Sequence, residues 1–381
     1  MEQSGFVKWM RRIALGATIT AVAGVLVAMW VFSSILARDL LTPATAAEIT
    51  FDLEVATVRS GSISLTRTPL TELDGVWGLQ SEDAYGQVTA VIEVREDVVE
   101  RAFRPIEGEF REGDRVRFEE YAFAGTPVEA HGIGFEVVPV AGELGVLPAW
   151  RVDGVRTTWV IVIHGEGKGR RQGLRILPAL QEQGFPVLMM TYRNDVETSP
   201  APDGRYSWGR EEWRDVEDAV TYVRLLGAEE IVLYGHAMGG EIAAMFLHES
   251  ELVGDVVGVV LDSPVLDFEA VVDAVAVDRG IPGFVASGAK ALVTLRFDVD
   301  WRELDQVERA AEFDVPILVL HGEADERAPV SVSDAFAAAR PDIVTYERFA
   351  GVGHGFLWNA DPTRYEAAVT NFLAGVSAPL E

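Results

Sequence analysis

The sequence predicts an α/β protein with a doubly wound, mostly parallel sheet, preceded by one membrane helix and a small β-rich module. Three observations lead to this class. From Thr157 onward, apolar runs of strand length alternate with helical stretches, which is typical of parallel sheets with helices on both faces. These runs are continuous rather than alternating, as expected for strands buried on both faces. Near the N-terminus, 25 consecutive residues carry no charge.

The uncharged stretch from Ile13 to Ala37 predicts a transmembrane helix. At ~1.5 Å per residue it reaches roughly 37 Å, enough to cross a hydrocarbon core of ~30 Å with some tilt. Lys8, Arg11 and Arg12 precede it, so the positive-inside rule places residues 1–12 in the cytoplasm. The sequence therefore predicts a single-pass plasma-membrane protein with its main domain outside the cytoplasm.

Two tryptophans, Trp9 and Trp30, are candidates for the two membrane interfaces. A cleaved signal peptide is the competing interpretation, with Ala44-Thr45-Ala46 as its cleavage site. Signal peptides have an apolar region of about 7–15 residues, so the length of this stretch favours an uncleaved anchor. Residues 38–48 are interpreted as a juxtamembrane linker.

Residues 49–150 show short β-like runs separated by turn signals, and they predict a small β-rich module that packs on the next domain or spaces it from the bilayer. The expected strands are Ile49–Val58, Ser62–Arg67, Gly86–Val94, Arg115–Tyr121 and Ile133–Val140. His131 is the lone histidine of this region, and we interpret it as structural.

Residues 151–381 form the predicted α/β domain. Its expected strands are Thr158–Ile163, Pro186–Thr191, Glu230–Tyr234, Val256–Leu261 and Val315–Leu320, and its expected helices include Arg170–Gln183, Glu211–Leu226 and Gly239–Glu249. Residues 267–313 interrupt the alternation with mixed helical patterning. We expect them to form a short helical cap over a site.

Charge and composition exclude several classes of function. The formal net charge is −28, and residues 38–381 alone carry −30 because residues 1–12 contribute +2. Such a body repels phosphate backbones, so nucleic acid is not an expected partner. The chain has no cysteine, which excludes disulfides, thiolate metal sites and a cysteine nucleophile.

The segment Ile231–Gly240 reads as a strand, a sharp glycine turn and the start of a helix. This pattern matches the nucleophile elbow G-x-S-x-G, except that Ala237 stands at the serine position. Glycines are needed beside that position because the turn is strained and the strand and helix pass close together. The chain thus keeps the elbow but lacks its hydroxyl.

Three further motifs occur around the elbow. The run His164-Gly165-Glu166-Gly167 follows one apolar strand, His321-Gly322-Glu323-Ala324-Asp325 follows another, and Gly351–Phe356 encloses His354 between glycines. In this order the motifs resemble the α/β-hydrolase superfamily over roughly residues 150–375. The soluble body, with Tyr192-Arg193-Asn194-Asp195, is also similar to membrane-anchored α/β-hydrolases common in actinobacteria.

The resemblance implies acyl transfer to water without a cofactor. A serine at position 237 would attack an ester carbonyl, His354 would carry the proton, and Asp325 would orient the imidazole. Asp262, directly after another strand, is the alternative acid. The backbone N–H groups of Met238 and Glu166 would bind the oxyanion, and the Glu166 carboxylate must then point away from it.

Aromatic residues near the expected pocket suggest an apolar acyl or aromatic site, although each could equally be core packing: Tyr192, Trp208, Trp213, Phe356 and Trp358. His164 is expected to bond within its own loop, and His236 is interpreted as a spacer in the elbow. No histidine pair has the spacing of a zinc protease, and the glycines after His164 lack phosphate-loop spacing, so neither a metal nor a phosphate site is predicted.

Ala237 leaves two interpretations open. In the first, the parent protein is a serine ester hydrolase acting on a small-molecule or lipid ester, and this chain is an inactive Ser→Ala variant. In the second, the chain is a natural pseudoenzyme that binds a lipid, a peptide or a partner protein at the cell surface. The sequence does not distinguish ester substrates from thioester or amide substrates. It does not indicate the oligomeric state.

Overall fold

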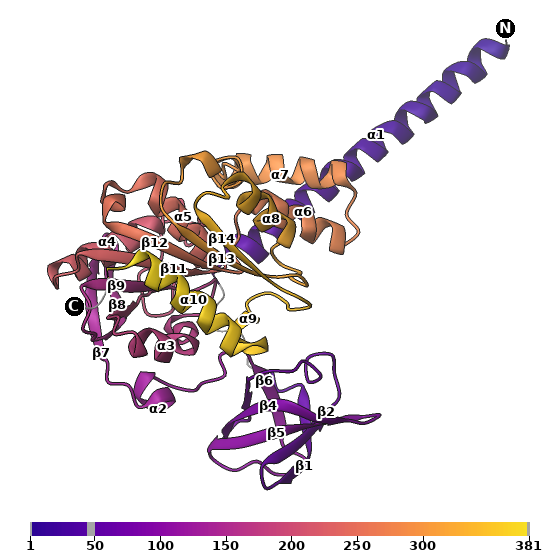
Figure 1. The fold of residues 1–381 in the computed structure, drawn as a ribbon. Coiled ribbons are helices and arrows are strands. Elements are labelled where there is room, and N and C mark those ends of the chain that lie inside the picture. Colours follow the sequence, from indigo (N-terminus) through magenta and orange to yellow (C-terminus); the bar gives the residue numbers. More distant parts are fainter. Residues whose placement is uncertain (1, 44–49, 379–381) are drawn as a thin grey trace.

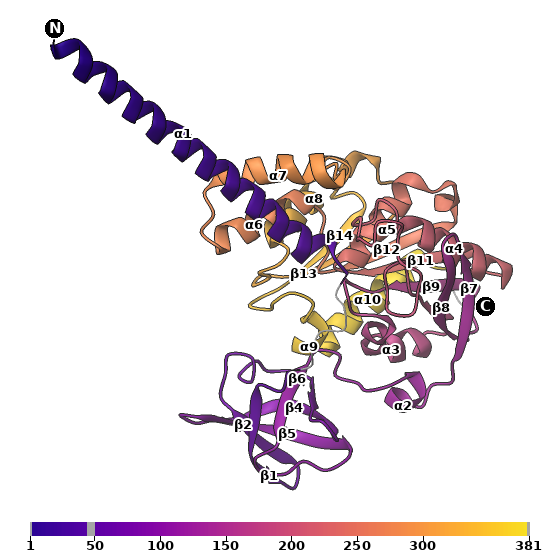
Figure 2. The same cartoon turned by 180° about the vertical axis from the view of Figure 1, so that it is seen from behind.

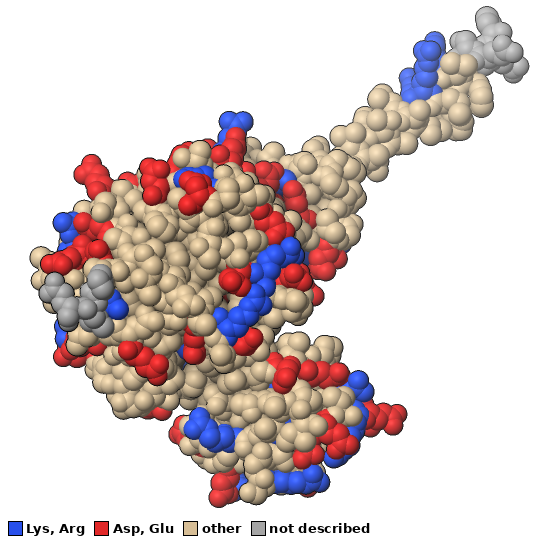
Figure 3. Space-filling model, in the orientation of Figure 1, with Lys and Arg blue, Asp and Glu red and all other residues tan. Residues whose placement is uncertain are grey.

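The computed structural model describes residues 2–43 and 50–378, which form a long N-terminal helix, a small barrel and a large α/β domain (Figure 1). Helix α1 (Glu2–Leu36) continues into one turn of π-helix, η1 (Ala37–Leu41). Most of α1 projects from the body, and its far end carries the basic side chains (Figure 3). Residues 6–41 are long and apolar enough to cross a membrane by length and composition, as a signal sequence also is. The alternative cleavage site at residues 44–46 lies outside the described residues.

The β-rich module is a closed barrel with the strand order β1-β2-β5-β4-β3-β6. Its strands are β1 (Leu53–Arg59), β2 (Ser62–Thr66), β3 (Trp77–Gln80), β4 (Tyr85–Val94), β5 (Val98–Glu107) and β6 (Arg115–Glu119). Closure removes the exposed sheet edges that a free antiparallel sheet would present. Inward-facing apolar residues, including Val55, Leu65 and Val116, fill the interior.

Arg101 of β5 lies fully buried in this barrel and is held by backbone carbonyl oxygens. Its Nε donates to Thr89 at 2.8 Å, its Nη1 to Thr71 at 2.9 Å and Leu73 at 2.7 Å, and its Nη2 to Gly75 at 3.1 Å. The guanidinium therefore ties strand β4 and the loop before β3 to strand β5. Burial lowers the pKa of Arg101 to about 10, so the group stays charged at neutral pH.

The expected division at residue 150 is wrong in one respect, because the last strands of that region belong to the large sheet. Strands β7 (Glu136–Gly142) and β8 (Gly145–Val152) form a hairpin, and β8 pairs antiparallel with β10 (Val187–Met189). The barrel itself ends at Glu119. A half-exposed hairpin has the same alternating pattern in either place, so the pattern alone does not assign it.

The α/β domain contains an eight-stranded sheet in the order β14-β13-β12-β11-β9-β10-β8-β7. Its central strands are parallel: β9 (Thr158–Ile163), β10, β11 (Glu230–His236), β12 (Val256–Asp262), β13 (Ile317–Gly322) and β14 (Val344–Phe349). This is the α/β-hydrolase fold, which confirms the predicted fold class, and the N-terminal apolar helix and the β module are present as expected. The edge strand β14 was not predicted.

Helices cover both faces of this sheet, and alternate strand residues feed two separate cores. Helices α4 (Trp213–Leu225), α5 (Met238–Glu249) and α8 (Val330–Ala339) cover one face, and α3 (Leu177–Glu182) and α10 (Pro362–Val376) cover the other (Figures 1 and 2). The short elements are α2 (Pro127–His131), η2 (Arg170–Arg175), η3 (Glu251–Asp255), η4 (Ala310–Glu312) and α9 (Leu357–Ala360).

The segment expected to form a cap holds two helices, α6 (Phe268–Asp278) and α7 (Gly283–Phe297). Both views show α7 beside the lower part of α1 (Figures 1 and 2). The barrel contacts the α9 region, where Asn359 Nδ2 donates to the carbonyl oxygens of Val76 at 2.7 Å and Glu120 at 2.8 Å. The cap and the barrel thus approach the α/β domain near the ends of its parallel strands.

Candidate functional site

A cavity of about 630 Å³ lies where β9, β11, β12 and β13 end. Loops that follow these strands supply Gly165, Ala237, Asp262 and Ala324, and the loop after β14 supplies His354. In parallel α/β sheets, ligands bind at the carboxyl ends of the strands, and the volume is in the usual range for a small-molecule pocket. This cavity is the candidate site.

Ala237 lies at the turn between β11 and α5 with φ of 47° and ψ of −112°. This backbone conformation is strained for a residue with a Cβ atom. The flanking glycines allow the turn: a Cβ on Gly235 would lie 2.4 Å from Gly239 O, and one on Gly239 would lie 2.3 Å from Ile163 O. The segment therefore has the geometry of a nucleophile elbow, with a methyl group in place of the hydroxymethyl group.

His354 and Asp325 form a hydrogen-bonded pair, with His354 Nδ1 lying 2.7 Å from Asp325 Oδ2. His354 lines the cavity with its side chain 17% exposed, whereas the Asp325 side chain is fully buried. Burial raises the pKa of Asp325, but hydrogen bonds from His321 and His354 outweigh it and hold this pKa well below its usual range. Asp325 is thus an ionised carboxylate directed at the imidazole.

The alternative acid, Asp262, pairs with a different histidine. His236 Nδ1 lies 3.0 Å from Asp262 Oδ2, and the Tyr365 hydroxyl donates to the same oxygen at 2.7 Å. Both His236 and Asp262 are buried yet reach the cavity wall. His236 Nε2 has no hydrogen-bond partner within residues 2–43 and 50–378. His236 is therefore part of a buried network beneath the elbow rather than a mere spacer.

The protonation of His236 is expected to make stability depend on pH. Burial lowers the pKa of His236, and the hydrogen bond with Asp262 offsets only part of that effect. The unfolded chain, with an ordinary histidine pKa of ~6.5, binds a proton there before the folded chain does, so the free energy of unfolding falls as the pH drops below ~6.5.

Replacing His236 by asparagine, whose amide can still donate to Asp262, is expected to reduce this loss of stability. Urea unfolding at pH 7.5, 6.0 and 5.0 measures the loss for both proteins. Burial also lowers the pKa values of His131 and His248, and these contribute to both proteins alike. If the free energy of unfolding falls equally in the two proteins between pH 7.5 and pH 5.0, His236 is not the source of the pH dependence.

The loop after β9 lies against the elbow, as the oxyanion prediction requires. A Cβ on Gly165 would lie 3.3 Å from the Ala237 methyl, and Gly165 N donates to Gln172 Oε1 at 2.7 Å. Met238, the first residue of α5, also lines the cavity, and the first N–H groups of a helix have no partner within it. Glu166, which follows Gly165, lines the same cavity as Met238 and Ala237, so the two expected donor residues border one cavity.

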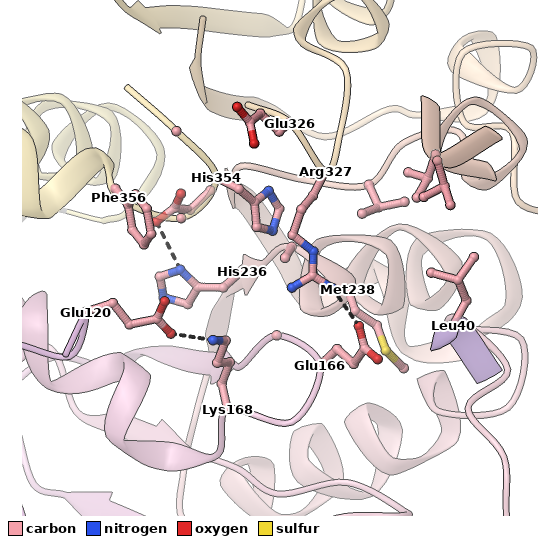
Figure 4. A pocket seen from close by; sticks show the side chains of 18 of the residues that line it. Leu40, Glu120, Glu166, Lys168, His236, Met238, Glu326, Arg327, His354 and Phe356 are labelled. Carbon is pink, nitrogen blue, oxygen red and sulfur yellow. Dashed lines mark hydrogen bonds and ion pairs between the residues drawn. The ribbon is translucent and has the colours of Figure 1, made fainter. Parts of the chain in front are cut away.

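The Glu166 side chain is drawn toward Arg327, with Arg327 Nη2 lying 3.1 Å from Glu166 Oε2 (Figure 4). Burial raises the pKa of Glu166, and the Arg327 charge opposes this shift. The pair joins the loop after β9 to the loop after β13. Arg327 thus balances a carboxylate that would otherwise repel a developing oxyanion.

Two further polar residues in the cavity were not predicted from the sequence. Lys168 Nζ lies 2.5 Å from Glu120 Oε1, and both side chains line the cavity (Figure 4). Burial raises the pKa of Glu120, but the Lys168 charge outweighs it and the net pKa is lowered. Lys168 lies in the glycine-rich loop after His164, and no feature of the sequence indicated that its side chain would line the cavity. Glu120 directly follows the last barrel strand, in a region where the sequence suggested no catalytic or binding residue.

Of the five aromatic residues expected in the pocket, Trp208 and Phe356 line the cavity. The other three pack elsewhere. Tyr192 is fully buried and stacks on His164 at 4.4 Å, Trp213 contributes to the core under α4, and the Trp358 indole donates to Glu366 at 2.8 Å. His164 bonds to Gly165 O and Asp195, both at 2.8 Å, so its expected structural role is confirmed.

The barrel supports this site through Phe356. The Phe356 ring meets the Trp77 ring of β3 edge-on at 5.0 Å, and Phe356 follows His354 by two residues. Edge-to-face aromatic contacts of this kind are worth roughly 0.5–1.5 kcal/mol beyond burial. The β module therefore touches the loop that carries the histidine.

One wall of the cavity comes from the end of the N-terminal helix. Leu36, Asp39 and Leu40 line it, and Figure 4 shows Leu40 on the side away from Glu120. The Trp208 indole donates to Leu40 O at 2.7 Å, and Tyr206 N donates to Leu41 O at 2.8 Å. No local pattern in the sequence predicted this contact.

Two family models match the chain. The one described as the alpha/beta hydrolase fold covers residues 158–310, which run from β9 through the cap helices. The other describes a domain of unknown function and covers residues 54–119, which coincide with the barrel. No curated protein matches the sequence.

Solved structures with the same fold include an esterase from Pyrococcus furiosus, with 18% identity and a TM-score of 0.53. That alignment covers 67% of this chain and 95% of the esterase. The structure of DcsB in complex with its substrate analogue is also similar, with 18% identity, a TM-score of 0.50 and coverage of 64% of this chain and 100% of DcsB. At this identity the likeness shows the fold alone.

Proposed function

Because this chain is a member of the α/β-hydrolase superfamily, we propose that it has the site of a serine-type carboxylic ester hydrolase, which is catalytically silent while alanine occupies position 237. The observation that carries the proposal is the His354–Asp325 pair, 2.7 Å apart, in the cavity that Ala237 also lines. In this proposal His354 and Asp325 are two members of a catalytic triad, and Ala237 stands at the position of the third.

With serine at position 237, each group has a defined task. The serine Oγ would attack the ester carbonyl carbon while His354 Nε2 takes its proton, and the backbone N–H groups of Met238 and Glu166 would bind the oxyanion. His354 would then protonate the leaving alkoxide, releasing the alcohol. Water would hydrolyse the acyl-enzyme by the same steps, with Asp325 holding the imidazole throughout.

The cavity favours an ester with an apolar acyl or alcohol portion. Val265, Val271, Val275 and Leu40 contribute apolar surface. The three basic residues of the lining are each paired with an acidic one: Arg279 with Asp39, Lys168 with Glu120 and Arg327 with Glu166. We propose that α1 anchors the protein in the plasma membrane, with residues 1–12 in the cytoplasm because Lys8, Arg11 and Arg12 lie there. The hydrolase domain then faces the outside of the cell.

A covalent probe tests the proposed site without a known substrate. Fluorophosphonates react with the activated serine of such triads, so Ala237→Ser protein is expected to gain the mass of one phosphonyl group, while the parent protein gains none. Intact-mass spectrometry reads the result. The double variant Ala237→Ser with His354→Ala is the matched control, and it should label far more slowly. Equal labelling of both variants, or none of either, would contradict the proposal.

A second candidate function is ligand binding by a natural pseudoenzyme. It is favoured by the Glu166–Arg327 ion pair, which occupies the oxyanion loop with charges that ester hydrolysis does not require. In this case the cavity should bind fatty acids measurably by calorimetry while Ala237→Ser stays inert toward esters. Binding with gain of hydrolysis supports the first function instead.

A further inference from the structure

The cap helix α7 lies alongside the proposed membrane helix, within the uncharged stretch of α1. A Cβ on Gly288 would lie 2.4 Å from Met29 Sδ. Farther along α7, the Arg296 guanidinium lies 4.1 Å above the Trp30 ring and donates to Ser33 Oγ at 2.7 Å. The stretch without charge continues to Ala37, so the cap touches α1 at a level roughly 12 Å before that stretch ends.

These contacts give the direction of α7 relative to α1. Residue numbers rise together in the two helices, from Gly288 beside Met29 to Arg296 beside Ser33. Phe284, one turn before Gly288, therefore lies up to ~6 Å farther toward the middle of the proposed span. Both cartoon views show the start of α7 nearest to the projecting part of α1 (Figures 1 and 2).

The outward face of α7 is uncharged. Its exposed positions after the first residue are Phe284, Ser287, Ala291, Thr294 and Leu295, spaced by the helical repeat. Phe284 is 60% exposed and Leu295 is 81% exposed. The two charged residues of α7 point elsewhere, because Lys290 pairs with Asp273 at 2.7 Å and Arg296 reaches α1. A helix that faces water normally carries charged residues on that side, and the whole chain carries a net charge of −28.

An ion pair between the cap and the chain after α1 lies at the other end of this contact. Arg279, just after α6, pairs with Asp39 at 2.9 Å, and Asp39 follows the uncharged stretch. Asp278 is exposed next to them. Along α1, the Arg279–Asp39 ion pair thus lies at the level of residue 39, the Arg296 guanidinium lies at the level of Trp30 and Ser33, and the exposed Phe284 ring lies beyond the level of Met29. This order matches the change from water to headgroups to hydrocarbon at a bilayer surface.

We propose that the outward face of α7 rests in the outer leaflet of the membrane that α1 crosses, and that the cavity takes an amphiphilic acyl substrate from that leaflet. Leu36 and Leu40 at the end of α1 line the cavity together with Val271 and Val275 of α6, the cap helix that precedes α7. The proposal rests on the membrane anchoring and the acyl site proposed above. Beyond those two proposals, this inference specifies how the cap is oriented toward the membrane and where the ligand comes from.

The chain has no cysteine, so single cysteines report position without background. Phe284→Cys and Leu295→Cys are labelled with an environment-sensitive fluorophore in the full chain, reconstituted in phosphatidylcholine vesicles. Val22→Cys in α1 is the reference inside the membrane. Leu225→Cys, an 82% exposed apolar position at the end of α4, is the reference in water. Lipids brominated along the acyl chain serve as the quencher.

Quenching at residues 284 and 295 is expected to exceed that at residue 225 by about threefold or more and to approach that at residue 22. The inference fails if residues 284 and 295 behave like residue 225 while residue 22 is quenched. If residue 22 is not quenched either, the anchoring fails and the inference with it. Because the measurement needs no turnover, the esterase proposal stands or falls separately on the serine variant.

Discussion

Ala237→Ser protein is expected to hydrolyse p-nitrophenyl butyrate far faster than the parent chain, with a gain in kcat approaching ~10⁶-fold. The reason is that triad members act as a unit, so a site that keeps the other members recovers most of the rate when the missing one is restored. His354 and Asp325 are already bonded at 2.7 Å, and Glu166 and Met238, the expected oxyanion donors, line the same cavity as Ala237. Initial rates measured at saturating ester give the gain.

Two further variants separate triad catalysis from a weak general effect of the hydroxyl. In the serine background, His354→Ala should remove nearly the whole gain, and Asp325→Ala should remove a factor of ~10⁴, because the carboxylate orients the base but does not exchange the proton. Asp262→Asn tests the alternative acid and should leave the rate much closer to that of the serine variant. No gain in hydrolysis with serine in place would overturn the esterase proposal and favour the pseudoenzyme.

Arg101→Met is expected to destabilise the barrel by about 3–5 kcal/mol, the largest effect on stability that we predict for a single side chain. Methionine fills much of the same volume, but it leaves the carbonyl oxygens of Thr71, Leu73 and Gly75 without the donor that satisfies them. The bond to Thr71 is fully buried, so water does not easily replace the guanidinium there.

Thermal melting and urea unfolding of both proteins measure this loss. Arg104→Met is the matched control, since Arg104 lies on the same strand with its side chain exposed, and its replacement should change the free energy of unfolding by no more than about 0.5 kcal/mol. Comparable losses in the two variants would show that the buried guanidinium is not what joins β4, β5 and the loop before β3.

The parallel core was predictable from sequence because its signals are local. The expected strand Thr158–Ile163 coincides with β9. The glycines around Ala237 reveal the elbow, because a Cβ atom on Gly235 would lie only 2.4 Å from Gly239 O. The order of the motifs along the chain also identified His354 and Asp325 as partners. Each of these features depends on residues close together in sequence or on a pattern that recurs in the superfamily.

Other features of the site depend on contacts between distant segments. The β7–β8 hairpin has the same alternation as a barrel strand, so its membership in the large sheet follows only from pairing with β10. The His236–Asp262 pair joins the ends of strands β11 and β12, and the Glu120–Lys168 pair joins the segment after β6 to the loop after β9. Aromatic composition also misled, since Tyr192, Trp213 and Trp358 fill cores that the sequence does not distinguish from a pocket.

The wall that residues 36–41 contribute to the cavity has a practical consequence for studies of this protein. A soluble fragment that starts at the barrel would lose the carbonyl acceptors of Trp208 and Tyr206 and would open the cavity at Leu36 and Leu40. Substrate preferences measured on such a fragment would belong to a cavity that is wider and more open to water than that of the full chain. With the proposed membrane anchoring, proteolytic cleavage between α1 and the barrel would have the same effect, so release from the membrane would itself change the substrate preference.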